Sequence, residues 1–120
     1  NRKSFRAYAQ QKFNTMKKIV LLGRLGINIP NFQTGITTKG IELFSGTNLE
    51  EVDTVFEQNN YKIDMVIMGA GISLENRLQI IEYIFTVSKG TTVHMKDWNS
   101  GPQGMLPFVN NVLSGLINES

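Results

Sequence analysis

Four short apolar blocks, separated by segments with helical periodicity, constrain the fold of this chain more than any other feature. The blocks occupy residues 19–22, 40–44, 63–68 and 91–95. Blocks that are apolar on both faces are typical of buried parallel strands, because helices cover both faces of a parallel sheet. Strands that alternate with helices also predict parallel pairing through right-handed crossovers. We therefore predict an α/β domain of three layers, in which a parallel sheet of about four strands carries helices on both faces.

Three helices are predicted between and after these strands. One follows Thr47, which stands three residues before Glu50 at the spacing of a capping box. The next begins after Ser73, a good N-cap residue, and the last covers residues 105–116. The apolar stripe of the middle helix consists of Leu74, Leu78, Ile81 and Phe85, widened by Ile80 and Ile84. Residues 25–39 contain Pro30 and two glycines, and they predict a loop with short irregular turns.

The composition indicates a folded globular domain and excludes several kinds of site. With 120 residues, of which 41% are hydrophobic, the chain is long enough for one core and too short for two. It has no cysteine, which excludes a disulfide scaffold, a thiolate zinc site and a cysteine nucleophile. It has one histidine, and no apolar run approaches the ~20 residues that span a bilayer. We expect a cytoplasmic protein with no metal and no cofactor.

Residues 1–15 form a basic extension before a single α/β domain, which we place at residues 16–120. Residues 1–41 contain eight Lys or Arg and no Asp or Glu, whereas residues 42–120 carry a net charge of −6. Phe5, Ala9 and Phe13 recur at the spacing of a short amphipathic helix. The extension fits a tag, a processed leader or the edge of a fragment. Its charges fit either a solvated face or an arm for nucleic acid or an acidic partner.

Two glycine turns follow the first and third predicted strands. They are Gly23-Arg24-Leu25-Gly26 and Gly69-Ala70-Gly71-Ile72. Open parallel sheets bind ligands at the carboxyl ends of the strands, where the chain order reverses. With a strand order of 2-1-3-4, both turns lie at this point, and Lys96 and Asp97 end the neighbouring strand. The candidate ligand-binding residues are therefore Gly23, Arg24, Gly26, Gly69, Ala70, Gly71, Ser73, Lys96 and Asp97.

These turns fit two interpretations. Glycines after a strand let backbone amides face an anion, and a helix that starts at Ser73 adds partial positive charge. Arg24 and Lys96 can supply full charges. However, the dinucleotide fingerprint G-x-G-x-x-G and a Walker A motif are both absent, and Glu75 would repel an anion. A structural turn, which is the simpler interpretation, and a cradle for a phosphate or nucleotide therefore both stay open.

Residues 17–117 resemble a response-regulator receiver domain and, more broadly, the Rossmann or flavodoxin-like group. The segment DMVIMG, residues 64–69, is similar to the third strand of a receiver domain, and Lys96 falls where that family often has a lysine at a strand end. The family's phosphoacceptor aspartate would stand at or near Gly69, and its metal-binding acids near Gly23 and Arg24. Neither is present. The resemblance therefore implies a pseudo-receiver, without a Mg²⁺ site and without acyl-phosphate chemistry.

Three further residues in and after the last predicted strand have alternative roles. His94 fits a hydrogen-bonded structural residue better than a general base, since a base needs a carboxylate or a substrate proton nearby. Trp98, beside Asn99 in a polar loop, fits a contact for a partner or a ring-bearing ligand, or else packing over the sheet edge. No residue pattern indicates a catalytic pair.

The sequence favours a non-catalytic binding or regulatory module that recognises a partner protein or a small anionic ligand at the strand ends. The alternative is an enzyme or enzyme subunit that uses a nucleotide or phosphorylated substrate at the same place. Self-association is also open. Nucleic-acid binding through residues 1–15 is least favoured, because the aromatic stacking motifs of RNA-binding domains are lacking. We expect no membrane attachment.

Overall fold

The computed structural model describes residues 16–97 and 104–117 of the chain. Within these residues, four strands alternate with four helices. The elements are β1 (Lys17–Leu22), α2 (Ile29–Thr34), β2 (Ile41–Gly46), α3 (Leu49–Gln58), β3 (Met65–Met68), α4 (Leu74–Val87), β4 (Thr92–Met95) and α5 (Met105–Ile117). In the described part of the chain, no helix is long and apolar enough to cross a membrane.

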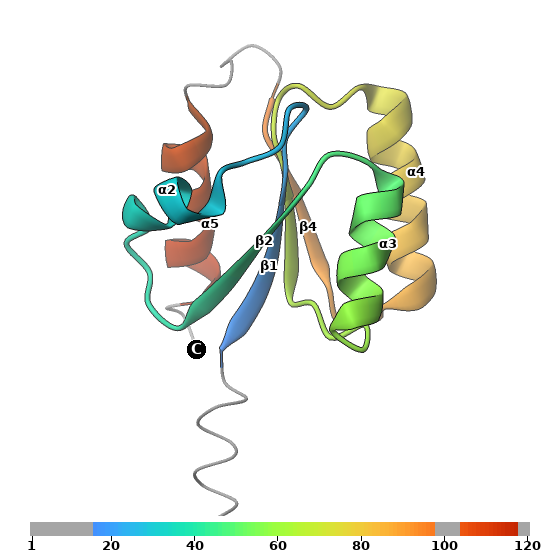
Figure 1. Cartoon of the computed structure of the whole chain (residues 1–120), viewed down its shortest axis with the longest axis horizontal. Coiled ribbons are helices and arrows are strands. Elements are labelled where there is room, and N and C mark those ends of the chain that lie inside the picture. The colour runs from blue at the N-terminus through green and yellow to red at the C-terminus, as the bar shows by residue number, and fades with distance from the viewer. Residues whose placement is uncertain (1–15, 98–103, 118–120) are drawn as a thin grey trace, which may run out of the picture.

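The four strands form one parallel sheet in the order β2-β1-β3-β4. Figure 1 shows α2 and α5 on one face of this sheet and α3 and α4 on the other. The predicted three-layer, flavodoxin-like architecture and the strand order 2-1-3-4 are therefore confirmed. Leu22 at the end of β1 pairs in register with Gly46 of β2 and with Met68 of β3. The carboxyl ends of neighbouring strands thus lie along one edge of the sheet, which we call the carboxyl rim.

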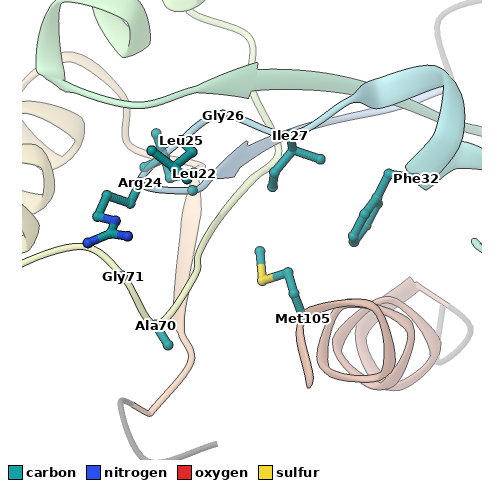
Figure 2. A pocket seen from close by; sticks show the side chains of 10 residues that line it. Leu22, Arg24, Leu25, Gly26, Ile27, Phe32, Ala70, Gly71 and Met105 are labelled. Atoms are coloured by element: carbon teal, nitrogen blue, oxygen red, sulfur yellow. The ribbon is translucent and has the colours of Figure 1, made fainter. Parts of the chain in front are cut away.

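Residues 25–39 contain a helix that the sequence analysis did not predict. α2 begins after Asn28, whose Oδ1 accepts a hydrogen bond from the amide of Asn31 at 3.2 Å, and Pro30 lies in its first turn. Proline disfavours the interior of a helix but suits the first turn, which is why the expectation of a loop was wrong for residues 29–34. Figure 2 shows that α2 places Phe32 beside the same space as Met105, the first residue of α5.

The N-cap of α3 lies one residue later than predicted. Asn48 is the N-cap, and its Oδ1 accepts a hydrogen bond from the amide of Glu51 at 2.9 Å. The Glu51 carboxylate in turn accepts hydrogen bonds from the amide and the hydroxyl of Thr47, each at 2.6 Å. These hydrogen bonds lower the pKa of Glu51, because they stabilise its charged form. The reciprocal pattern resembles a capping box, but Asn48 and not Thr47 supplies the cap.

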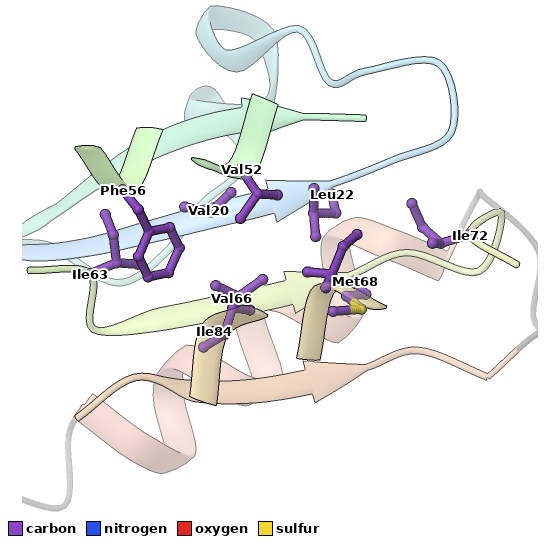
Figure 3. Packing of buried hydrophobic residues seen from close by; sticks show 10 residues of the cluster. Val20, Leu22, Val52, Phe56, Ile63, Val66, Met68, Ile72 and Ile84 are labelled. Carbon is purple, nitrogen blue, oxygen red and sulfur yellow. The ribbon is translucent and has the colours of Figure 1, made fainter. Parts of the chain in front are cut away.

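Buried apolar side chains join the sheet to α3 and α4. Figure 3 shows this cluster, which includes Val20 and Leu22 of β1, Val66 and Met68 of β3, and Ile84 of α4. A second cluster on the opposite face joins the sheet to α5 and α2. Both faces of β1 are therefore buried over residues 19–22, as the apolar pattern of this block predicts.

The apolar stripe expected on α4 does not form one buried face. Ile80 and Ile84 are buried. By contrast, Leu74, Leu78 and Phe85 are 56%, 57% and 63% exposed. The helix carries two adjacent apolar rows, and contact with α3 decides which one is covered. On the covered side, Tyr83 packs edge-on against Phe56 of α3 with ring centroids 5.8 Å apart, and Ile81 also packs against the core cluster.

Candidate functional site

A cavity of about 610 Å³ lies at the carboxyl rim, between the two glycine turns (Figure 2). Five of the predicted ligand-binding residues line it: Gly23, Arg24, Gly26, Ala70 and Gly71. These residues meet because β1 and β3 are neighbours in the sheet, so the turns that follow the two strands lie side by side. The convergence of the turns is therefore a property of the fold, while their role in ligand binding stays a prediction.

Hydrogen bonds hold the two turns in place. The amide of Gly69 donates to the carbonyl of Leu22 at 2.7 Å, which ties the turn after β3 to the end of β1. The amide of Ile27 donates to Oγ of Ser45 in β2 at 3.0 Å. Between these points the chain turns sharply at Gly26, where φ is 82°, a conformation that favours glycine. Backbone and side-chain hydrogen bonds within the protein thus fix the positions of both turns.

Gly71 permits the closest approach between the turns. A Cβ atom added at residue 71 would lie 3.0 Å from Cβ of Arg24, so only glycine leaves this contact unstrained. The stem of Arg24 consequently runs along the turn at Gly71, and Figure 2 shows its guanidinium on that side of the cavity. Arg24 is exposed and is the one charged residue that lines the cavity in the described part of the chain. Among residues 16–97 and 104–117 it has no ion-pair partner.

The remaining wall of the cavity is apolar. It consists of Leu22, Leu25, Ile27, Phe32 and Met105. Ile27 and Phe32 also pack against the core cluster beneath α5. Asn110 of α5 holds the chain just after α2, since it donates to the carbonyl of Gly35 and accepts from the amide of Thr37, both at 3.0 Å. The apolar wall is therefore anchored to the body of the domain.

The sequence did not predict this wall. Apart from Leu22 of β1, its members come from the segment that was expected to be a loop and from the start of α5. The available signal was the spacing of Ile29, Phe32 and Ile36, which recur at the interval of an amphipathic helix. Pro30, at a position suited to a helix start, is the second signal.

A buried arginine, also missed, supports the turn after β3. Arg77 of α4 donates from Nε to the carbonyl of Ile72 at 3.0 Å. Its Nη2 donates to the carbonyls of Gly69 at 2.9 Å and Lys96 at 3.0 Å. Burial lowers the pKa of Arg77, because desolvation penalises the charged form, although an arginine in a protein stays protonated. The sequence signal was a single cation beside the apolar positions of α4.

The other four predicted ligand-binding residues do not line the cavity. Ser73 is the N-cap of α4, and its Oγ accepts a hydrogen bond from the amide of Asn76 at 3.2 Å, as predicted for a cap. Gly69 is hydrogen-bonded through its amide to the carbonyl of Leu22 in β1. Lys96 is 3% exposed, and Asp97 is exposed beyond the end of β4. Trp98 and Asn99, the predicted partner contacts, lie outside the described residues.

His94 is half-buried on the face of β4 that α5 covers. It pairs in register with Ile67, a member of the cluster beneath α5. Its Nε2 lies 3.1 Å from Oγ1 of Thr92. Burial lowers the pKa of His94, because desolvation disfavours the imidazolium form. These contacts fit the predicted structural role.

A comparison with known proteins finds no matching family model, no matching curated protein and no matching solved structure. The described residues contain no group of three or more His, Cys, Asp or Glu that could hold a metal ion. The features that bear on function are therefore those of the cavity: one cation, two glycine turns and an apolar wall.

Proposed function

We propose that this protein is a non-catalytic binding module that takes a small anionic ligand at the carboxyl rim. The observation that carries the proposal is the state of Arg24. Its exposed side chain lines the cavity, and no carboxylate in the described part of the chain forms an ion pair with it. An arginine presents several N–H donors in a fixed plane, which match the oxygens of a carboxylate or a phosphate. Arg24 is therefore the residue that would hold the anion.

The backbone around Arg24 offers further donors. The amides of Arg24, Ala70 and Gly71 have no hydrogen-bond acceptor among residues 16–97 and 104–117. Amides in glycine-rich turns can cradle an anion, because no Cβ atom blocks the approach. Gly71 and Gly26 keep this approach open on either side of Arg24.

The same lining favours binding over catalysis. General acid–base catalysis needs a histidine, carboxylate or similar group within hydrogen-bond reach of the reacting proton. Of the described residues that line the cavity, Arg24 alone is titratable. Arginine stays protonated in proteins and so serves for charge stabilisation.

Calorimetric titration of the full chain with inorganic phosphate and with pyrophosphate at low salt tests the proposal. A ligand at ten times its Kd should stabilise the protein by about 1.4 kcal/mol and raise the Tm by several degrees. Arg24→Gln should weaken binding at least tenfold, and added salt should weaken binding to the wild type.

Lys39→Gln is the matched control, because Lys39 is an exposed cation just before β2, at the opposite edge of the sheet. This variant should bind like the wild type. Equal losses in the two variants would mean that only net charge matters, and unchanged binding in Arg24→Gln would contradict the proposed site.

A further inference from the structure

We infer that the ligand of the carboxyl-rim cavity is an amphiphilic anion, in which an oxyanion is joined to an aromatic or similarly apolar body. This inference rests on the proposed function and specifies the class of ligand that the same cavity takes. It follows from the contrast between the single charge of the cavity and the apolar character of the rest of its wall.

The apolar wall is the first part of the argument. Figure 2 shows Arg24 at one side of the cavity, and Ile27, Phe32 and Met105 at the other. A phenylalanine ring and a methionine thioether both make favourable contacts with an aromatic group. A bare inorganic anion held by Arg24 would leave the exposed parts of Ile27 and Phe32 in contact with water.

Leu25 is the second part of the argument. It lines the cavity, yet it is 87% exposed, more than any other large apolar side chain among the described residues. Arg24 and Leu25 line the same cavity, so a ligand that reaches Arg24 also lies within reach of Leu25. An apolar body would remove Leu25 from water, whereas a phosphate ion would gain nothing from this side chain.

The size of the cavity is the third part. At about 610 Å³ it falls in the range of small-molecule sites, roughly 300–1,000 Å³, and is much larger than a phosphate ion needs. One ligand can therefore contact both Arg24 and the apolar wall. The two contacts should reinforce each other in a single molecule.

The experiment compares three probes on the full chain by calorimetric titration: inorganic phosphate, phenyl phosphate and benzyl alcohol. Phenyl phosphate should bind at least about tenfold more tightly than phosphate, because the ring buries apolar surface that phosphate lacks. Benzyl alcohol, which has the ring without the anion, should bind more weakly than phenyl phosphate by a similar factor.

Leu25→Ser provides the decisive variant, since this exposed side chain contributes little to folding. It should reduce the affinity for phenyl phosphate several-fold and leave the affinity for phosphate unchanged. The matched control is Leu78→Ser, which removes an exposed leucine from α4 that does not line the cavity. This control should bind both probes like the wild type.

The outcomes separate the inference from the proposed function. Equal affinities for phosphate and phenyl phosphate would overturn the inference and leave anion binding intact. The same holds if Leu25→Ser and Leu78→Ser behave alike. If neither phosphate nor phenyl phosphate binds, or if benzyl alcohol binds as tightly as phenyl phosphate, the proposed anion site itself fails and the inference fails with it.

Discussion

Replacing Arg77 by methionine should destabilise the domain more than any change on the exposed face of α4. Arg77 is 7% exposed, and its guanidinium donates three hydrogen bonds, to the carbonyls of Gly69, Ile72 and Lys96. Methionine is similar in length but has no donor. The substitution therefore leaves three acceptors without their donor at the point where α4, the turn after β3 and the end of β4 meet.

The size of the effect follows from two opposing contributions. A hydrogen bond from a charged donor contributes about 1.5–3 kcal/mol, and an acceptor left unsatisfied in a buried place costs about 1–3 kcal/mol. Removing a buried charge recovers part of its desolvation cost. We expect the free energy of unfolding to fall by about 2–4 kcal/mol, a large fraction of the roughly 5–15 kcal/mol that stabilises a typical domain.

Urea unfolding followed by circular dichroism measures this change, with the m-value as a check that unfolding stays two-state. The control is Gln79→Met, at an exposed position on the same helix, which should change stability by no more than about 0.5 kcal/mol. A loss below about 1 kcal/mol in Arg77→Met, with an unchanged m-value, would refute the view that Arg77 holds the turn together.

Three further predictions concern the caps, the rotation of α4 and the single histidine. Asn48→Ala should cost about 1 kcal/mol in urea unfolding, because it removes the N-cap of α3, and an unchanged midpoint would argue against this cap. Ile84→Ala should lower the free energy of unfolding by about 2–5 kcal/mol, whereas Phe85→Ser should change it by no more than about 0.5 kcal/mol. A larger loss in Phe85→Ser than in Ile84→Ala would mean that α4 is rotated differently. Since burial lowers the pKa of His94 below its ordinary value of 6.5, the unfolded chain takes up the proton first as the pH falls. The free energy of unfolding should therefore begin to decrease as the pH falls below about 7.5, and an unchanged pH dependence in His94→Gln would contradict this role of the histidine.

Much of the architecture could be predicted from the sequence, because the rules that govern it act on neighbours along the chain. The apolar blocks at residues 19–22 and 63–68 predicted buried strands, and Ser73 predicted the start of a helix. Alternation of strands and helices then left few topologies, of which order 2-1-3-4 is the observed one. The meeting of the turns at Arg24 and Ala70 followed from that order alone.

The chemistry of the cavity wall required the tertiary structure. Phe32 and Met105 are far apart in the chain, and nothing local to either residue indicates that they line the same space. The expectation of a loop before β2 also hid the helix that carries Phe32. The predicted site therefore contained the glycine turns but not the apolar part of the cavity wall.

The sequence alone indicated the four strands and three of the four helices among the described residues and, given a strand order of 2-1-3-4, the place where the two turns converge. The tertiary structure decided which apolar row of α4 is covered, and how Arg77 supports the turn after β3. It also decided that Lys96 is buried away from the cavity. The physical reason is that periodicity records only the neighbours along a chain, whereas burial depends on which surfaces other elements present. Where a helix offers two apolar rows, only contact with the rest of the fold selects between them.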